Sequence, residues 1–253
     1  PDVETVLFAQ GGIASALGGV TDLLLEGAAA ATSGRTAEAA RAAATFLRRH
    51  RDVARGLIPA GPARRRLLAT IDEAAREYRE LCVAIGVLGH LAPRASDLLV
   101  SRGERMAAQI VAAALSRARR RAAYVDAADV VVTDGHHGGA APALGATSRI
   151  ARRRIAPLLE AGTIAVLPGF IGRAPDGSIT TLGRGGSDLT ATLLSRALGA
   201  RRVVLWKDVP GILTADPRLV TDARLIPQLH HREAAEVAHY GAKVLHPRAL
   251  IPI

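Results

Sequence analysis

The sequence predicts an α/β protein with three layers, in which helices cover both faces of a mainly parallel central sheet. From residue 95 onward, short runs of β-branched residues alternate with helical segments, which is typical of a parallel sheet buried on both faces. The chain has 253 residues, of which 49% are apolar and 22% charged, so it can bury a full core. We therefore expect an αβα sandwich.

The part of the chain before residue 95 is predicted to be helical, because alanine and arginine recur there at helical spacing. Thr21 is a candidate N-cap for a first helix over 22–31. A second helix is predicted over 36–49. Two prolines and a glycine mark a break at 58–62, after which a third helix is predicted over 63–86.

Strands and helices are expected to alternate in the rest of the chain. The strand candidates are 123–126, 130–132, 163–168 and 202–206. The helix candidates are 104–121, 148–160, 187–198 and 232–239. We find no internal repeat and no low-complexity linker.

The composition excludes several classes of protein. The longest uncharged stretch, 5–21, contains two Gly-Gly pairs and is shorter than the roughly 20 apolar residues of a membrane helix. The first residues lack the pattern of a signal peptide. The single cysteine, Cys82, excludes an internal disulfide and is expected in the core rather than as a nucleophile. We expect a cytoplasmic protein that does not bind membranes.

The net charge of +10 comes almost entirely from arginine, since only Lys207 and Lys243 are lysines. A nucleic-acid-binding protein could carry such a charge. The arginine runs are spread along the chain, however, and few aromatic residues are available to stack on bases. We therefore favour solvated helix faces over a nucleic-acid partner.

The most informative segment is 180–188, TTLGRGGSD, which lies between a strand-like run and a predicted helix. Its glycines allow the backbone to approach an anion closely, and the N-terminus of the following helix directs N–H groups to the same place. Arg184 can bind a carboxylate through two hydrogen bonds. The alternative is that the glycines form only a turn and that Ser187 and Asp188 only cap the helix.

Other segments also collect polar residues at the ends of predicted elements. Asp208 follows a strand, at the sheet edge where α/β proteins bind ligands, although Asp, Pro and Gly also form ordinary turns. Lys243 follows a helix and could reach a phosphate. Glu104 lies at a helix start, where it could simply favour the dipole. The segments in question are 203–218, 240–247, 101–105 and the small-residue loop 15–22.

Taken together, these segments resemble those of the aspartokinases, within the amino acid kinase superfamily, in that family's order along the chain. The resemblance runs from about residue 12 to 253 and is most specific at 183–188 and at 240–247, YGAKVLHP. It implies the amino acid kinase fold, with residues 1–253 expected to be a catalytic domain incomplete at both ends, a helical insert at about 30–95 and no regulatory domain. The insert resembles that of aspartokinases fused to homoserine dehydrogenase.

The resemblance implies that the γ-phosphoryl group of ATP is transferred to the side-chain carboxylate of L-aspartate, the first step of lysine, threonine and methionine biosynthesis. Arg184 would pair with the α-carboxylate of aspartate, and Ser15 would face the transferred phosphoryl group. Thr21, Glu104 and Asp188 would hold the rest of the substrate, and Arg184, Asp188 and Ser15 form the implied catalytic set. The implied ATP-binding residues are Gly185, Gly186, Ser187, Lys207, Asp208, Leu213, Arg218 and Lys243.

Mg²⁺ is expected to bridge the phosphates of ATP and to be held largely by the nucleotide. Two histidine pairs, 136–137 and 230–231, are weak candidates for a transition-metal site. Adjacent side chains point in different directions, and no Cys or Glu lies at ligand spacing. We therefore expect no metal held by protein ligands alone. L-aspartate and ATP are the expected partners, and a homo-oligomer is compatible with the family.

The sequence departs from the family pattern in three places. The family begins with a Lys-Phe-Gly-Gly-Thr-Ser loop, of which residues 6–12 are only a faint echo. Lys207 stands where the family usually has threonine, and Leu213 where it often has tyrosine. The chain also stops before the last piece of the kinase domain. We expect a chain that truly begins at Pro1 to be nearly inactive, since a missing charge can slow phosphoryl transfer about 10³-fold. The alternative is an impaired or truncated binding module of the same fold.

Overall fold

A computed structural model describes residues 3–7, 11–118, 120–207, 209–216, 219–239 and 244–253. The strands are β1 (Val3–Leu7), β2 (Gly11–Leu17), β3 (Ala122–Tyr124), β4 (Ile164–Pro168), β5 (Ile171–Arg173), β6 (Ile179–Thr181) and β7 (Val204–Leu205). The helices are α1 (Val20–Thr32), α2 (Thr36–Leu57), α3 (Pro62–Leu88), α4 (Pro93–Arg117), α5 (Leu144–Arg154), α6 (Ala156–Glu160), α7 (Gly186–Leu198) and α8 (His231–His239). Two 3₁₀ turns are η1 (Ala127–Asp129) and η2 (Pro247–Leu250).

The central sheet has five strands in the order β3-β4-β2-β1-β7. Strand β4 is parallel to both β2 and β3, whereas β1 is antiparallel to β2 and to β7. β7 therefore runs in the same direction as β2, and β1 is the one reversed strand of this sheet. The predicted mainly parallel sheet is confirmed. A separate hairpin, β5-β6, lies beside it.

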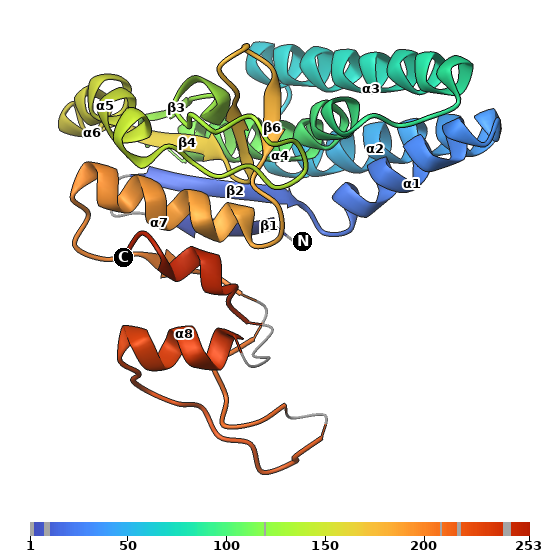
Figure 1. Cartoon of the computed structure of the whole chain (residues 1–253). Helices are drawn as coiled ribbons and strands as arrows, with labels where there is room; N and C mark the ends of the chain where they lie inside the picture. Colours follow the sequence, from blue (N-terminus) through green and yellow to red (C-terminus); the bar gives the residue numbers. More distant parts are fainter. Residues whose placement is uncertain (1–2, 8–10, 119, 208, 217–218, 240–243) are drawn as a thin grey trace.

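Alternate residues of the central strands face two different helical layers. Ile13 and Leu167 pack in a cluster with side chains of α5 and α7, which together cover one face. Their neighbours Ala14 and Val166 pack on the opposite face against α4. Figure 1 shows the sheet between α7 and α4. Successive side chains of a strand point to opposite faces, so both faces of this sheet carry apolar side chains that helices cover. The predicted αβα sandwich is confirmed.

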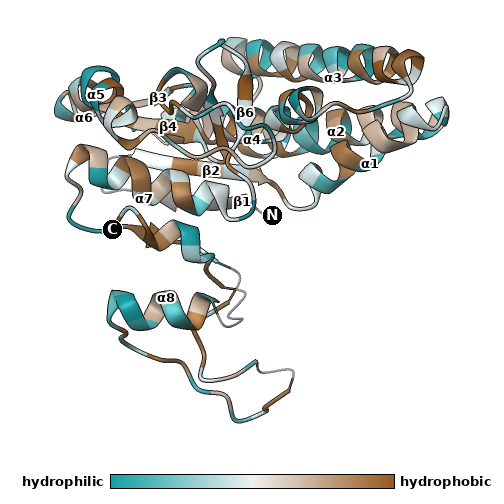
Figure 2. Cartoon of the chain, viewed as in Figure 1, coloured by the Kyte–Doolittle hydropathy of each residue, from teal (hydrophilic) through white to brown (hydrophobic). Residues whose placement is uncertain are grey.

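Helices α1, α2 and α3 pack with α4 into a helical layer beyond the end of the sheet (Figure 1). Phe46 and Tyr78 are fully buried at its centre, together with Leu24 and Ile71. Figure 2 shows apolar and polar residues alternating along α2 and α3, as expected for helices with one buried face. The predicted helices are confirmed, and α2 continues to Leu57, with Ala54 on its buried face and the buried Ile58 at its C-cap. That this layer is an insert stays a prediction.

Some predicted boundaries are wrong. Thr21 is not an N-cap, because Gly19 precedes α1 and Thr21 lies inside its first turn. Helix α4 begins at Pro93 rather than at Glu104, with proline in the first turn, where its missing N–H costs nothing. The predicted helix 148–160 is divided into α5 and α6, with Pro157 at the start of the second piece.

Two strand assignments also need correction. Residues 130–132 do not form a strand, because the N–H groups of Val130 and Val131 bond back to Ala127 and continue the turn of η1. Strand β2, by contrast, contains Ser15, which the sequence had placed in a loop. Glycine and alanine are frequent in β2, so its apolar pattern was not evident from the sequence.

The segment after β7 packs on the α7 side of the sheet, where Figure 1 shows η2 and α8. Arg196 of α7 donates to the carbonyl of Pro252 at 2.7 Å, and Arg248 of η2 donates to that of Leu182 at 2.6 Å. In the described part of the chain, no helix is long and apolar enough to cross a membrane.

His50 of α2 gives the helical layer a pH-dependent stability. Its side chain is fully buried, its Nδ1 lies 2.8 Å from the carbonyl oxygen of Phe46, and its ring lies 4.2 Å from the Phe46 ring. Burial lowers its pKa from 6.5 to about 4. Between pH 6.5 and about pH 4, the unfolded chain therefore binds a proton at this histidine that the folded chain does not bind. The free energy of unfolding must fall as the pH falls through this range.

We expect the free energy of unfolding to decrease by about 3 kcal/mol between pH 6.5 and pH 4 through His50 alone. Urea unfolding across this range measures the slope. His50→Leu should remove most of this slope, whereas His90→Leu, at an exposed position, should retain it. An unchanged slope in His50→Leu would contradict the assignment.

Candidate functional site

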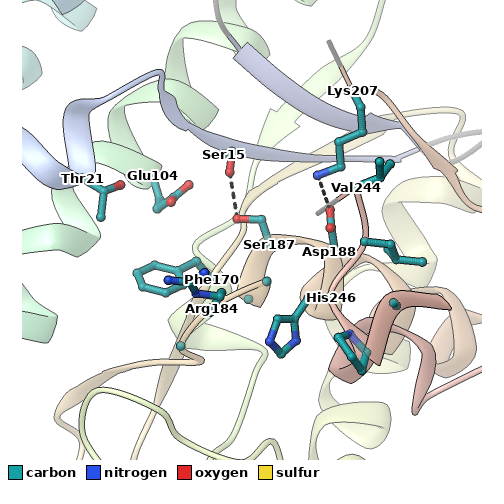
Figure 3. A pocket seen from close by; sticks show the side chains of 16 residues that line it. Ser15, Thr21, Glu104, Phe170, Arg184, Ser187, Asp188, Lys207, Val244 and His246 are labelled. Atoms are coloured by element: carbon teal, nitrogen blue, oxygen red, sulfur yellow. Dashed lines mark hydrogen bonds and ion pairs between the residues drawn. The ribbon is translucent and has the colours of Figure 1, made fainter. Parts of the chain in front are cut away.

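A pocket of about 560 Å³ opens where β2, the start of α7 and the end of β7 come together. Residues from distant parts of the chain line it, and Figure 3 shows their side chains around one hollow. The lining residues are Ser15, Thr21, Glu104, Phe170, Gly183, Arg184, Gly185, Gly186, Ser187, Asp188, Lys207, Ala238, Val244, Leu245, His246 and Pro247.

The N-terminus of α7 forms the floor of the pocket. Gly185 precedes the helix with φ 73°, a left-handed conformation that glycine adopts at little cost. Ser187 follows one residue into the helix, and its Oγ accepts a hydrogen bond from Ser15 Oγ at 2.9 Å, which joins α7 to β2. A Cβ on Gly169 would lie 2.7 Å from the Ser187 side chain, so the close approach of residue 169 to Ser187 requires glycine. The positive end of the α7 dipole thus faces the pocket.

A buried ion pair lies on one side of this floor. Asp188 is in the first turn of α7 and is only 6% exposed. Lys207, which follows β7, places its Nζ 3.2 Å from Asp188 Oδ1. A carboxylate so deeply buried is costly without a cationic partner, and Lys207 supplies one. The pair therefore fixes an ammonium group beside the helix N-terminus.

A second group of polar side chains lies on the other side. Figure 3 shows Thr21, Glu104 and Arg184 across the Ser15–Ser187 contact from Lys207. Glu104 projects from α4 and is 4% exposed, whereas Arg184 is exposed at the turn before α7. The pocket thus has an end with a guanidinium, a carboxylate and a hydroxyl group, and another with an ammonium and a helix N-terminus.

Most of the site residues predicted from the sequence line this one pocket. They are Ser15, Thr21, Glu104, Arg184, Gly185, Gly186, Ser187, Asp188 and Lys207. Leu213 does not line it: this residue is bridged to Leu225 in the segment after β7. Asp208, Arg218 and Lys243 lie outside the described residues. Ser187 and Asp188 are inside the first turn of α7, so neither is its N-cap.

The site residues predicted from the sequence did not include Phe170 and His246, whose rings line the pocket. Phe170 has φ 69°, unusual for a residue with a side chain, and its N–H donates to Thr190 Oγ1 at 3.0 Å. The neighbouring Gly169 was the signal that could have indicated this tight turn. His246 lies against the α-carbon of Gly185. It belongs to the segment 240–247, in which only Lys243 had been singled out.

The histidine pairs have other partners. His137 Nδ1 lies 2.9 Å from Asp97 Oδ2, and the rings of His230 and His231 stack at 4.2 Å from each other. Within the described ranges, no three His, Cys, Asp or Glu side chains cluster as metal ligands would. Asp188 is paired with Lys207, so the pocket fits a cation that arrives bound to a ligand better than one held by protein carboxylates.

An αβα sandwich in which a helix N-terminus, two cationic side chains and two buried carboxylates line one pocket is typical of α/β proteins that bind a small charged ligand at the edge of the sheet. The profile of the amino acid kinase family matches residues 13–253. The chain belongs to the amino acid kinase family. This confirms the fold that the sequence resemblance implied.

The similar proteins are aspartokinases. Lysine-sensitive aspartokinase 3 of Escherichia coli is 44% identical over 160 residues, which are 63% of this chain and 35% of that protein. Bifunctional aspartokinase/homoserine dehydrogenase 2 of Arabidopsis thaliana is 30% identical over 95% of this chain and 26% of its own. The chain therefore spans about a third or less of the length of these relatives. The resemblance to aspartokinases seen in the sequence is confirmed.

A solved structure extends the likeness to three dimensions. The crystal structure of E. coli aspartokinase III in complex with aspartate and ADP has a TM-score of 0.81 with this chain at 34% identity. The match covers 95% of this chain and 52% of that one. That protein binds a nucleotide and an amino acid together.

Proposed function

We propose that this chain catalyses transfer of the γ-phosphoryl group of ATP to the side-chain carboxylate of L-aspartate, as part of an aspartokinase. The observation that supports this best is that one pocket joins an end with a guanidinium, a carboxylate and a hydroxyl group to an end with an ammonium group and a helix N-terminus. The similarity to a protein solved with aspartate and ADP supports the same pair of ligands. The product, 4-phospho-L-aspartate, would supply lysine, threonine and methionine biosynthesis.

At the first end, Arg184 binds the α-carboxylate of aspartate through its guanidinium group. Glu104 accepts from the substrate ammonium group, and Thr21 contributes its hydroxyl group. Because Glu104 is almost fully buried, its charge acts in a low dielectric, where it selects an amino acid over a simple dicarboxylate. Asp188 lines the same pocket, and its contribution to substrate binding is shared with its ion pair to Lys207.

At the second end, the α7 N-terminus and Lys207 neutralise the phosphates of ATP, close to Ser15, Ser187 and Gly186. Mg²⁺ would neutralise further phosphate charge when bound with the nucleotide. A carboxylate oxygen of aspartate forms the new bond to the γ-phosphorus, while the bond to the bridging oxygen of ADP breaks. Since the acceptor is already ionised, no base has to remove a proton, and the residues need only position and neutralise charge.

Aspartyl hydroxamate formation from ATP, Mg²⁺, aspartate and hydroxylamine tests this function. Arg184→Ala should lower kcat/KM for aspartate on the order of 10²-fold, because it removes a donor from the clamp. Arg201→Ala is the matched control, since Arg201 is exposed after α7 and does not line the pocket. The assay is run on this chain and on the intact gene product that contains it.

The alternative function, an impaired binding module, makes a different prediction in the same assay. ATP would bind with ordinary affinity, but neither this chain nor the intact product would form hydroxamate. Phosphorylation of glutamate without aspartate would reject the substrate assignment.

A further inference from the structure

Asp97, which plays no part in the proposed chemistry, has an unusually complete set of hydrogen bonds. It lies in the second turn of α4, and its side chain is only 3% exposed. Its Oδ1 accepts from Thr181 Oγ1 at 2.5 Å, and both of its oxygens accept from the backbone N–H of Gly138 at 3.2 and 3.0 Å. His137 Nδ1 lies 2.9 Å from Oδ2. Such saturation is what makes a buried carboxylate tolerable.

These bonds connect α4 to two neighbouring segments, 138–140 and 180–182, which lie next to the Arg184 turn. Thr181 ends β6, three residues before Arg184. The carbonyl oxygen of Thr181 accepts from the N–H of Ala140 at 2.8 Å, so residues 138–140 run beside it. A Cβ on Gly183 would lie 3.3 Å from the α-carbon of Gly139, which shows how closely the segments pack just before Arg184. Movement of residues 138–140 would therefore be transmitted to the turn.

The same two segments, 138–140 and 180–182, are joined a second time by a residue of η2. Arg248 of η2 donates through Nη1 to the carbonyl of Leu182 at 2.6 Å and through Nη2 to that of Ala140 at 3.1 Å. Segments 138–140 and 180–182 thus form one backbone unit, to which both Asp97 and Arg248 are hydrogen-bonded. Among the described residues, no hydrogen bond or ion pair holds the guanidinium of Arg184 itself, so its location depends on this backbone unit.

We propose that Asp97 is a positioning residue for the amino acid substrate: through Thr181 and Gly138 it fixes the turn that presents Arg184 to the substrate α-carboxylate. This inference rests on the proposed function, which places aspartate at Arg184. Binding of a carboxylate by two parallel hydrogen bonds requires a well-placed guanidinium, so a loosened turn weakens aspartate binding. The phosphate-binding end, at the α7 N-terminus and Lys207, does not depend on Asp97.

The test measures ligand binding by isothermal titration calorimetry, with aspartate and with a non-hydrolysable ATP analogue in turn. Thr181→Val keeps the shape of the side chain but removes the hydroxyl group that donates to Asp97. We expect it to raise the Kd for aspartate about tenfold and to change the Kd for the analogue less than twofold. Thr181→Ser, which retains the hydroxyl group, should restore most of the affinity, and Asp97→Asn should resemble Thr181→Val.

Thr180→Val is the matched control. Thr180 is the preceding residue of β6, is fully buried, and its hydroxyl group is 2.8 Å from that of Thr133 rather than from Asp97. Thr180→Val should lower the melting temperature as much as Thr181→Val does, but leave the Kd for aspartate unchanged. A purely structural role for Asp97 would give both variants the same aspartate affinity.

Two outcomes would overturn the inference, and they can be distinguished. If the unaltered protein binds aspartate and Thr181→Val binds it equally well, the positioning role is wrong while the proposed function stands. If the unaltered protein binds the ATP analogue but not aspartate, the proposed function fails, and the inference fails with it.

Discussion

Replacing Gly185 by alanine is expected to lower the activity of this protein on the order of 10²-fold and to destabilise it by about 2–3 kcal/mol. Gly185 has φ 73°, and an added Cβ would collide with the Cβ of His246, which packs directly against Gly185. Both atoms are attached directly to the backbone, so neither can rotate away. Either the N-terminus of α7 or the segment that contains His246 must move, and both line the site.

Gly199→Ala provides the control at the other end of the same helix. Gly199 has φ 68°, nearly the angle of Gly185, but no atom lies within 4 Å of the position its Cβ would occupy. The Gly199→Ala variant should therefore lose only about 1 kcal/mol of stability, from the strain of the left-handed conformation. Its hydroxamate formation should be unchanged. Equal losses of activity in both variants would show that backbone strain, and not the collision in the pocket, causes the effect.

Replacing Gly27 by leucine is expected to lower the free energy of unfolding by about 4 kcal/mol. Gly27 lies in α1 where α2 and α3 approach it closely. Its Cβ would lie 2.5 Å from the Cβ of Ala42 and would collide with the hydroxyl group of Tyr78. That hydroxyl group donates to the carbonyl of Leu24 at 2.8 Å, a buried bond that the collision would break. The three carbon atoms that leucine carries beyond its Cβ also have no room in this core.

Gly56→Leu is the corresponding control in α2. No atom lies within 4 Å of the Cβ position of Gly56, so leucine meets open space there. Because leucine favours a helix more than glycine does, the variant should be about 0.5 kcal/mol more stable. Urea unfolding of the two variants should therefore give changes of opposite sign. Destabilisation by Gly56→Leu of the same size would contradict the packing argument.

The chemistry of individual segments could be predicted because it depends on residues that are close in the sequence. The order Arg184-Gly185-Gly186-Ser187 before an apolar helical pattern indicates an anion-binding helix N-terminus in any fold. The alternation of strands and helices beyond residue 95 likewise predicted a parallel sheet with two helical layers, because a strand buried on both faces has a continuous apolar run. The sheet and its helical layers are confirmed, and a helix does begin at Gly186 and line the pocket, whereas its binding of an anion stays a prediction.

Some predictions failed or stay open where a local pattern has more than one structural outcome. Leu213 was assigned to the nucleotide from its place in a motif; in the structure it is bridged to Leu225 and does not line the pocket, so its nucleotide contact stays a prediction. The valines at 130–132 have high strand propensity, yet Val130 and Val131 belong to a turn that starts at Ala127, and only Val132 forms a single β-bridge, to Arg173. Propensity is a weak preference of at most about 1 kcal/mol, and tertiary contacts override it.

The sequence by itself determined the class of fold, the family and the residue types of the site. Only the tertiary structure decided which of these residues meet and what holds them. Ser15 and Ser187 are 172 positions apart, and Asp97 and Thr181 are 84 apart, yet each pair is hydrogen-bonded. No spacing in the chain encodes such contacts, because they arise from the packing of helices on a sheet, which depends on all the side chains of the core together.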